Sequence, residues 1–246
     1  MAKLAIIGGS GFESLDALKI VHREVIRTPF GEPSAPLTYG IFHGKELIFL
    51  PRHGAAHTIP PHRVNYRANL WALQHAGVEQ ILGVAAVGGL HQPMKPGVLV
   101  IPDQIIDYTY GREHTYFEGD LTHVTHIDFS QPYCGSLRNS LLQAGEITAV
   151  PLQGKATYGV TQGPRLETAT EIDRMERDGC DLVGMTGMPE AALARELDIC
   201  YACCTVVANW AAGRGDGPIT MSEIEHNLVG GLDSVRKLLS CLVPRL

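Results

Sequence analysis

Short runs of apolar residues recur along the chain, and each run stops at glycine or at polar residues. Uninterrupted apolar runs of this length, bounded by turn-forming residues, are typical of strands buried on both faces. The pattern therefore predicts a largely buried β-sheet. The runs are Leu4–Ile7, Ile81–Val87, Val98–Ile101, Leu182–Met185 and Ile199–Ala208, the last being the longest.

Between these runs the apolar residues change to helical spacing. His62–Ala76 carries such a pattern and is followed by a glycine, which predicts a helix that ends there. Thr168 and Thr220 each stand three residues before a glutamate. This is the capping-box pattern, so we expect a helix to begin after each threonine. Pro189 suits the first turn of another helix, which runs to about Leu197.

Strands that alternate with helices predict the α/β class. We expect a single domain over residues 1–246, with a mixed, twisted central sheet flanked by helices. Two apolar segments on either side of His43–Glu46 predict a hairpin. The stretch Gly111–Pro132 is polar and rich in histidine, and we interpret it as a long loop or excursion.

Composition limits the classes of partner. Apolar residues make up 45% of the 246 residues and charged residues 19%, so a large core can form. The net charge of -6, without a basic run, argues against nucleic acid and favours a small substrate. No apolar stretch reaches the ~18 residues of a membrane span.

The six cysteines raise the question of redox state. Cys200 and Cys203 form a C-x-x-C pattern inside an apolar, β-prone segment, and we interpret it as a buried strand in preference to a redox or metal pair. The N-terminal sequence lacks the pattern of a signal peptide. We therefore expect a cytoplasmic protein with reduced thiols and without a disulfide framework.

Two turns that follow predicted strands suit an anion. Ser10 lies in the turn Gly8–Gly11, where bare backbone N–H groups and a hydroxyl can converge on phosphate. Arg52 offers a guanidinium fork that matches phosphate, and His53 beside it could add a donor. Each turn taken alone fits a tight surface turn equally well. The glycines only nearly match the dinucleotide fingerprint, so a nicotinamide dehydrogenase is a weak alternative.

Three further segments carry groups for the rest of a ligand. Glu167 precedes a helix, where its carboxylate either complements the helix dipole or accepts a hydrogen bond from a heterocycle. Met185 and Thr186 end a strand and suit a sugar face and a phosphate, although a lone methionine is more often core filling. Asn209 ends the longest strand, and its amide either caps a loop or offers a ligand a donor and an acceptor.

The order of these motifs resembles that of a known family. The strings IIGGSG, PRHG, HTIPPHRVNYRANLWAL, GPRLETATE and CDLVGMTGMPEAALARELDICYA are similar to those of the trimeric purine nucleoside phosphorylases, closest to the methylthioadenosine phosphorylase branch. The resemblance runs from Leu4 to about Leu239. It implies a pentosyltransferase in which inorganic phosphate, the co-substrate, attacks C1′ of the ribose and releases the purine. It implies no metal or other cofactor, and a homotrimer.

The resemblance also implies roles for individual residues. It assigns phosphate binding to Ser10, Arg52, His53, Thr186 and the backbone near Ala86. It assigns the ribose to Met185, the base to Asn209, Trp210 and Ala211, and the 5′ end of a neighbouring subunit's substrate to His126.

The chain departs from the adenine-directed members around the base. Those members carry an Asp-x-Asp pair after the long strand and a serine in the GPR segment, whereas this chain has Asn209 and Glu167, as the 6-oxopurine phosphorylases do. Asn209 can donate to O6 or N7 of hypoxanthine, and Glu167 can accept from N1–H. Adenine would present a lone pair at N1 instead, and sites with unpaired polar groups discriminate strongly.

The expected substrate follows from a second departure. Met221, with Ile224 one turn later, stands where 6-oxopurine phosphorylases place a histidine, and it suits a methylthio group. We therefore expect S-methyl-5′-thioinosine to give hypoxanthine and 5-methylthioribose 1-phosphate. Asn209 would stabilise the negative charge that develops on the purine. The alternatives are a methylthioadenosine phosphorylase, a general 6-oxopurine nucleoside phosphorylase and, from another class, a non-catalytic nucleotide-binding module.

Overall fold

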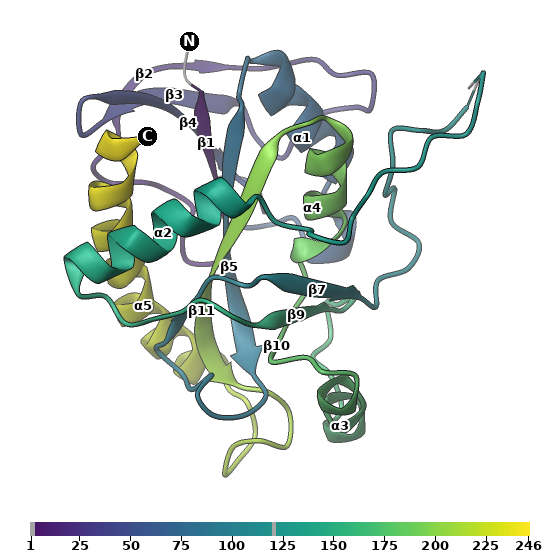
Figure 1. Ribbon diagram of the computed structural model, residues 1–246, viewed down its shortest axis with the longest axis vertical. Helices are drawn as coiled ribbons and strands as arrows, with labels where there is room; N and C mark the ends of the chain where they lie inside the picture. The colour runs from purple at the N-terminus through teal and green to yellow at the C-terminus, as the bar shows by residue number, and fades with distance from the viewer. Residues whose placement is uncertain (1–2, 120–121) are drawn as a thin grey trace.

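A computed structural model describes residues 3–119 and 122–246. Its centre is one mixed β-sheet, with helices on both faces (Figure 1). The strands are β1 (Leu4–Gly8), β2 (Lys19–Glu24), β3 (Leu37–Phe42), β4 (Lys45–Pro51), β5 (Gln80–Gly89), β6 (Leu99–Val100), β7 (Gln104–Asp107), β8 (Leu152–Gln153), β9 (Thr157–Val160), β10 (Leu182–Gly184) and β11 (Cys200–Trp210). The helices are α1 (Tyr66–His75), α2 (Gly135–Thr148), α3 (Ala169–Arg177), α4 (Gly187–Glu196) and α5 (Met221–Leu242), with short 3-10 turns at Pro61–Arg63 and Val243–Arg245.

β5 is the strand on which the sheet is assembled. It pairs in parallel with β1 on one side and with β11 on the other, and β10 joins it antiparallel at Gly88 and Gly89. β4 continues the parallel part next to β1, and the predicted hairpin, β3 with β4, adds an antiparallel edge. The expectation of a mixed sheet in an α/β fold is confirmed.

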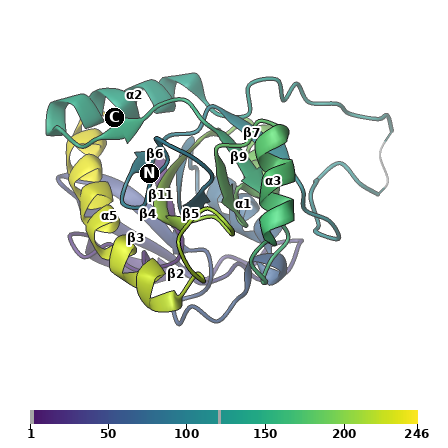
Figure 2. The same ribbon diagram turned by 90° about the horizontal axis from the view of Figure 1, so that it is seen from below.

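The two faces of the sheet carry separate cores, because successive side chains of a strand point to opposite faces. Along β5, Ile81 and Ala85 pack with one cluster and Leu82 and Val84 with the other. The first cluster is covered by α1 and α4, and the second by α2 and α5. Figure 2 shows α2 and α5 wrapping one side of the sheet.

Helix signals in the sequence located four of the five α-helices, and α2 was not predicted. The Thr168 hydroxyl accepts a hydrogen bond from the backbone N–H of Glu171, and the Glu171 carboxylate accepts one from the backbone N–H of Thr168, so the predicted capping box of α3 is confirmed. The Thr220 side chain caps α5 by accepting a hydrogen bond from the backbone N–H of Glu223. None of the described helices is both long and apolar enough to cross a membrane.

The sequence pattern did not reveal several elements of secondary structure, and β2 illustrates the reason. All six of its side chains are exposed, so no buried face imposes an alternating pattern on Lys19–Glu24. The described parts of the polar stretch Gly111–Pro132, residues 111–119 and 122–132, project from the body of the molecule (Figures 1 and 2), as expected for an excursion, while residues 120 and 121 lie outside the described residues.

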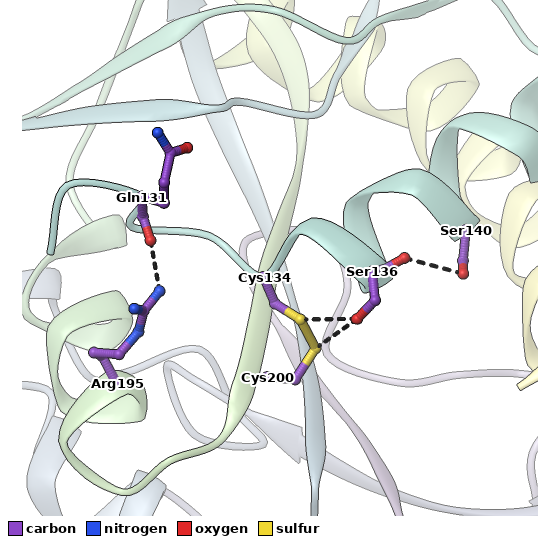
Figure 3. Close-up of a disulfide and its surroundings, with 6 residues drawn as sticks. All are labelled: Gln131, Cys134, Ser136, Ser140, Arg195 and Cys200. Carbon is purple, nitrogen blue, oxygen red and sulfur yellow. Dashed lines mark hydrogen bonds between the residues drawn. A yellow bond between two sulfur atoms is a disulfide. The ribbon is translucent and has the colours of Figure 1, made fainter. Parts of the chain in front are cut away.

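The expectation of reduced thiols is wrong for two of the cysteines. Cys134, before α2, and Cys200, at the start of β11, form a disulfide bond (Figure 3). Cys200 therefore pairs with a cysteine distant in sequence and not with Cys203, which is buried and free. The backbone N–H of Cys134 also donates to the carbonyl oxygen of Tyr201 at 2.8 Å. The sequence could not reveal the pair, because two cysteines 66 residues apart meet only through the fold.

Replacing Cys134 and Cys200 together by serine should lower the free energy of unfolding by about 2–4 kcal/mol, because the bond closes a long loop in the unfolded chain. Urea unfolding with and without a reductant measures the effect. The reductant should bring the wild-type curve to that of the double variant and leave the variant unchanged. Equal stability of the two proteins without reductant would contradict a formed disulfide.

Candidate active site

A cavity of about 920 Å³ lies at the ends of the central strands. Parallel strands deliver their carboxyl ends to one edge of a sheet, where ligands of α/β proteins usually bind. Eleven of the residues singled out from the sequence line this cavity. They are Ser10, Arg52, His53, Ala86, Glu167, Met185, Thr186, Asn209, Ala211, Met221 and Ile224.

Arg52 is held in a buried ion pair. Its guanidinium donates from Nε and Nη2 to the two carboxylate oxygens of Glu190, both at 2.7 Å, and from Nη1 to the carbonyl oxygen of Val84 at 2.8 Å. Both side chains are at most 1% exposed. Burial opposes the charge of Arg52, but the charge and hydrogen bonds of Glu190 raise its pKa above the usual range. Three of its five N–H groups are used, which leaves two for a ligand.

Gly9 is required for this packing. A Cβ atom there would lie 2.5 Å from the carbonyl oxygen of Val84 and 2.9 Å from Nη1 of Arg52. The absence of a side chain at Gly9 therefore lets the turn after β1 pass directly beside the guanidinium, and it brings Ser10 to the same cavity wall.

His53 is fixed in one protonation form. Its Nδ1 lies 2.8 Å from the carbonyl oxygen of Ile59, which can only accept, so Nδ1 carries a proton. Burial, and then the charge of Arg52, lowers the pKa of His53 to about 4. The ring is therefore neutral near neutral pH and its Nε2 is an acceptor. We had expected a donor from the sequence, and the buried site beside a cation is the reason for the difference.

The next wall is positioned by Arg112, which is buried where the excursion begins. Its guanidinium donates to the carbonyl oxygens of Met185 at 2.9 Å, Met188 at 2.6 Å and Gln162 at 2.8 Å. The bonds to Met185 and Met188 fix the backbone on both sides of Thr186. The Thr186 side chain makes no capping hydrogen bond to α4, and its hydroxyl lies instead within hydrogen-bond reach of the Tyr158 hydroxyl at the cavity wall.

Glu167 also lines the cavity, and its carboxylate is a hydrogen-bond acceptor. Its Oε1 accepts a hydrogen bond from the hydroxyl of Thr161 at 2.6 Å. Thr161 in turn donates its backbone N–H to the carbonyl oxygen of Gly184 at 2.8 Å, which ties this acceptor to β10. The carboxylate keeps further capacity to accept from a ligand N–H.

Asn209 reaches the cavity through an irregularity in β11. The register with β5 shifts between Val207 and Asn209, so Ala208 is an extra residue. Bulges of this kind bend a strand and redirect its side chains. Asn209 is 7% exposed, and its Nδ2 donates to the carbonyl oxygen of Trp210 at 2.7 Å. This bond uses one of the two amide N–H groups and leaves the other as a donor.

The remaining wall is apolar and comes mainly from α5. Met221 begins this helix and is 67% exposed, while Ile224 is half-buried one turn later. Ile219 and Leu228 line the same part of the cavity. This wall can contact an apolar group.

Two of the residues singled out from the sequence do not line the cavity. Trp210 lies next to Asn209 at the end of β11, and its side chain lies beside Gly215 and is not among the residues that line the cavity. His126 lies exposed on the projecting excursion. Its expected role in a neighbouring subunit's site stays a prediction.

Sequence reasoning missed the residues that hold the others in place. Glu190 holds Arg52, Arg112 holds the backbone at Met185, and Thr161 holds Glu167. A glutamate inside an otherwise apolar helical segment was the available signal for Glu190, since buried carboxylates require a partner. In the described part of the chain, no group of three or more His, Cys, Asp or Glu side chains could hold a metal ion.

Known proteins share this architecture and sequence. Residues 3–243 match the model of the phosphorylase superfamily. A probable S-methyl-5′-thioinosine phosphorylase of Pseudomonas syringae is 52% identical over 240 residues, which cover 98% of each chain. A 6-oxopurine nucleoside phosphorylase of Pyrococcus furiosus is 43% identical, covering 99% of this chain and 93% of the relative. The structure of methylthioadenosine phosphorylase from Schistosoma mansoni in complex with adenine superimposes with a TM-score of 0.95 at 32% identity, covering 100% of this chain and 92% of that one.

Glu190→Gln should lower the free energy of unfolding by about 3–5 kcal/mol, because it leaves the buried charge of Arg52 without a partner. Glu171→Gln is the matched control. Glu171 binds Arg165 through the same two-oxygen geometry at 2.8 Å, but these side chains are 43% and 68% exposed. Its loss should be below about 1 kcal/mol, since exposed pairs contribute little and glutamine still completes the capping box. If urea unfolding showed similar losses of unfolding free energy for both variants, the buried pair would not contribute more to stability than the exposed one.

Proposed function

Because the chain belongs to the phosphorylase superfamily, we propose that it cleaves S-methyl-5′-thioinosine with phosphate to hypoxanthine and 5-methylthioribose 1-phosphate. The observation that carries this choice is the pairing of Glu167 and Asn209 in one cavity. The cavity also lies beside Arg52 and an apolar wall, which suit a phosphate and a methylthio group. Relatives named for this substrate and for 6-oxopurine nucleosides support the proposal.

Phosphate binds at the end of the cavity formed by Ser10, Arg52, His53 and Thr186, with the backbone near Ala86. The two unused N–H groups of Arg52 and the hydroxyl of Thr186 donate to its oxygens. The acceptor Nε2 of His53 suits the P–OH group that hydrogen phosphate retains. A phosphate oxygen attacks C1′ of the ribose as the glycosidic bond breaks, and the anion stabilises the cationic sugar. The departing purine takes up one proton, equal to the one that the hydrogen phosphate group loses, so the products are neutral hypoxanthine and the dianion of 5-methylthioribose 1-phosphate. Met185 contacts the ribose.

The base binds between Asn209, Ala211 and Glu167. As the bond to the ribose breaks, its electrons move onto the purine, and the free N–H of Asn209 donates to N7 or O6 as this charge grows. Glu167, held by Thr161, accepts from N1–H. A 6-aminopurine lacks this N1–H, so the carboxylate would face a lone pair. We propose no metal or other cofactor.

We also propose a homotrimer in which the excursion reaches a neighbouring copy and brings His126 to its site. The excursion projects from the body of the subunit, which supports such an exchange (Figure 1). A cytoplasmic location stays a prediction. The bond between Cys134 and Cys200 argues against a strongly reducing compartment, where disulfides are rare.

The three candidate substrates separate the alternatives. With phosphate present, initial rates should be highest for methylthioinosine. They should be lower by about 10²-fold or more for methylthioadenosine, which leaves Glu167 unpaired, and by about 10-fold for inosine, which underfills the apolar wall. Preference for methylthioadenosine would contradict the assignment of the base. Equal rates on inosine would contradict the role of Met221 and Ile224.

Asn209→Ala should lower kcat by about 10²–10³, because it removes a donor to developing charge. Single-turnover measurements at saturating phosphate report the chemical step directly. Asn139→Ala, the same change on the exposed face of α2, is the control and should leave kcat unchanged. Full activity in Asn209→Ala would remove Asn209 from the mechanism.

A further inference from the structure

Three polar side chains form a chain of contacts at the phosphate end of the cavity. The hydroxyl oxygen of Ser10 lies 3.4 Å from Nε2 of His57, and Nδ1 of the same ring lies 2.6 Å from Oε1 of Glu13. Glu13 is itself held by the backbone N–H of Gly11 at 2.9 Å. Ser10, Glu13 and His57 all line the cavity. Glu13 and His57 thus reach the proposed phosphate site through Ser10.

The backbone holds His57 in place for this contact. Its φ of 52° lies in the left-handed region, which is uncommon for a residue other than glycine. The turn after β4 imposes it, because the N–H of His57 donates to the carbonyl oxygen of Gly54 at 3.1 Å. Unfavourable backbone conformations of this kind persist where the surrounding structure requires them, and they gather at functional sites.

The protonation of His57 decides where the hydroxyl of Ser10 points. A carboxylate can only accept, so Nδ1 carries the proton that meets Glu13. In the neutral ring Nε2 is then a bare acceptor, and the Ser10 hydrogen turns toward it and away from a ligand. In the imidazolium Nε2 donates to the Ser10 oxygen, which frees the Ser10 hydrogen for a phosphate oxygen.

The charges around the site favour this second form when an anion is bound. The charge of Arg52 is balanced by Glu190, and His53 is neutral, so neither offsets a phosphate dianion in full. Glu13 adds a negative charge beside a neutral His57. One proton on His57 cancels that charge. The ring centroids of His53 and His57 lie 5.0 Å apart, and Glu225 of α5 and Glu167 are the other carboxylates that line the cavity among the described residues.

We propose that Glu13 and His57 are positioning residues that couple phosphate binding to the uptake of one proton by His57, which turns the Ser10 hydroxyl onto the phosphate. The inference rests on the proposed phosphate site. The proton comes from the solvent and binds to Nε2, and no covalent bond of the phosphate changes in this step.

Calorimetric titration with sulfate tests the coupling without turnover. Sulfate remains a dianion without a proton of its own, so any proton taken up comes to the protein. The dependence of the binding enthalpy on the ionisation enthalpy of the buffer, at about pH 7.5, gives the number of protons taken up. The wild-type protein should take up between about half and one proton.

Matched variants assign the proton. His57→Gln should abolish the uptake, and Glu13→Gln should reduce it strongly. Both should raise the KM for phosphate by about 10-fold to 100-fold and leave the KM for the nucleoside unchanged. His75→Gln, an exposed histidine stacked on Trp71, should retain the wild-type uptake and KM.

The outcomes separate this inference from the proposed function. Sulfate binding without proton uptake, an uptake that persists in His57→Gln, or no sulfate binding at all would overturn the coupling, even in an active phosphorylase. Proton uptake that depends on His57, in a protein that cleaves no nucleoside, would overturn the proposed function and leave the coupling in place.

Discussion

The buried ion pair between Arg52 and Glu190 is the constraint on which the site depends. A guanidinium at the end of β4 is stable there because Glu190 of α4 meets it with both carboxylate oxygens and Tyr201 of β11 donates to the same carboxylate at 2.8 Å. Three elements distant in sequence therefore converge on one charge. Removing either partner would leave an uncompensated charge in the core, so the pair fixes the position of the strands as well as that of a ligand donor.

Around this fixed point the cavity is shaped by departures from regular structure. Gly9 permits the turn after β1 to touch the guanidinium, and the extra residue Ala208 turns Asn209 toward the ligand. Arg112 binds the carbonyl groups on both sides of Thr186. Regular strands would satisfy these backbone groups within the sheet. Backbone carbonyl groups in irregular segments need side-chain donors instead, which explains why the buried Arg112 stands where the excursion begins.

The parts that follow from local chemistry could be predicted from the sequence. The apolar run of β11 and the capping box at Thr168 could be recognised in the sequence, because burial and capping each leave a pattern within a few residues. The edge strand β2 has no buried face, and the bulge at Ala208 depends on β5, so neither leaves a local pattern. The same holds for the site. The order of the motifs along the chain was enough to predict Ser10, Arg52 and Asn209 as site residues. Glu190 and the disulfide partner of Cys200 are defined by tertiary contacts, which the sequence does not show.

Three basic side chains meet at the phosphate end, and their surroundings give them different chemistry. Arg52 is permanently charged but is neutralised by Glu190, so it offers directed N–H groups without excess charge. His53 is kept neutral by burial and by Arg52, so it offers an acceptor. His57 is 44% exposed and lies against Glu13, which gives its proton access to solvent and a counter-ion. Because an anion enters and leaves at every turnover, a proton exchanged with solvent can balance its charge, and of these three side chains His57 is the one placed to take up such a proton.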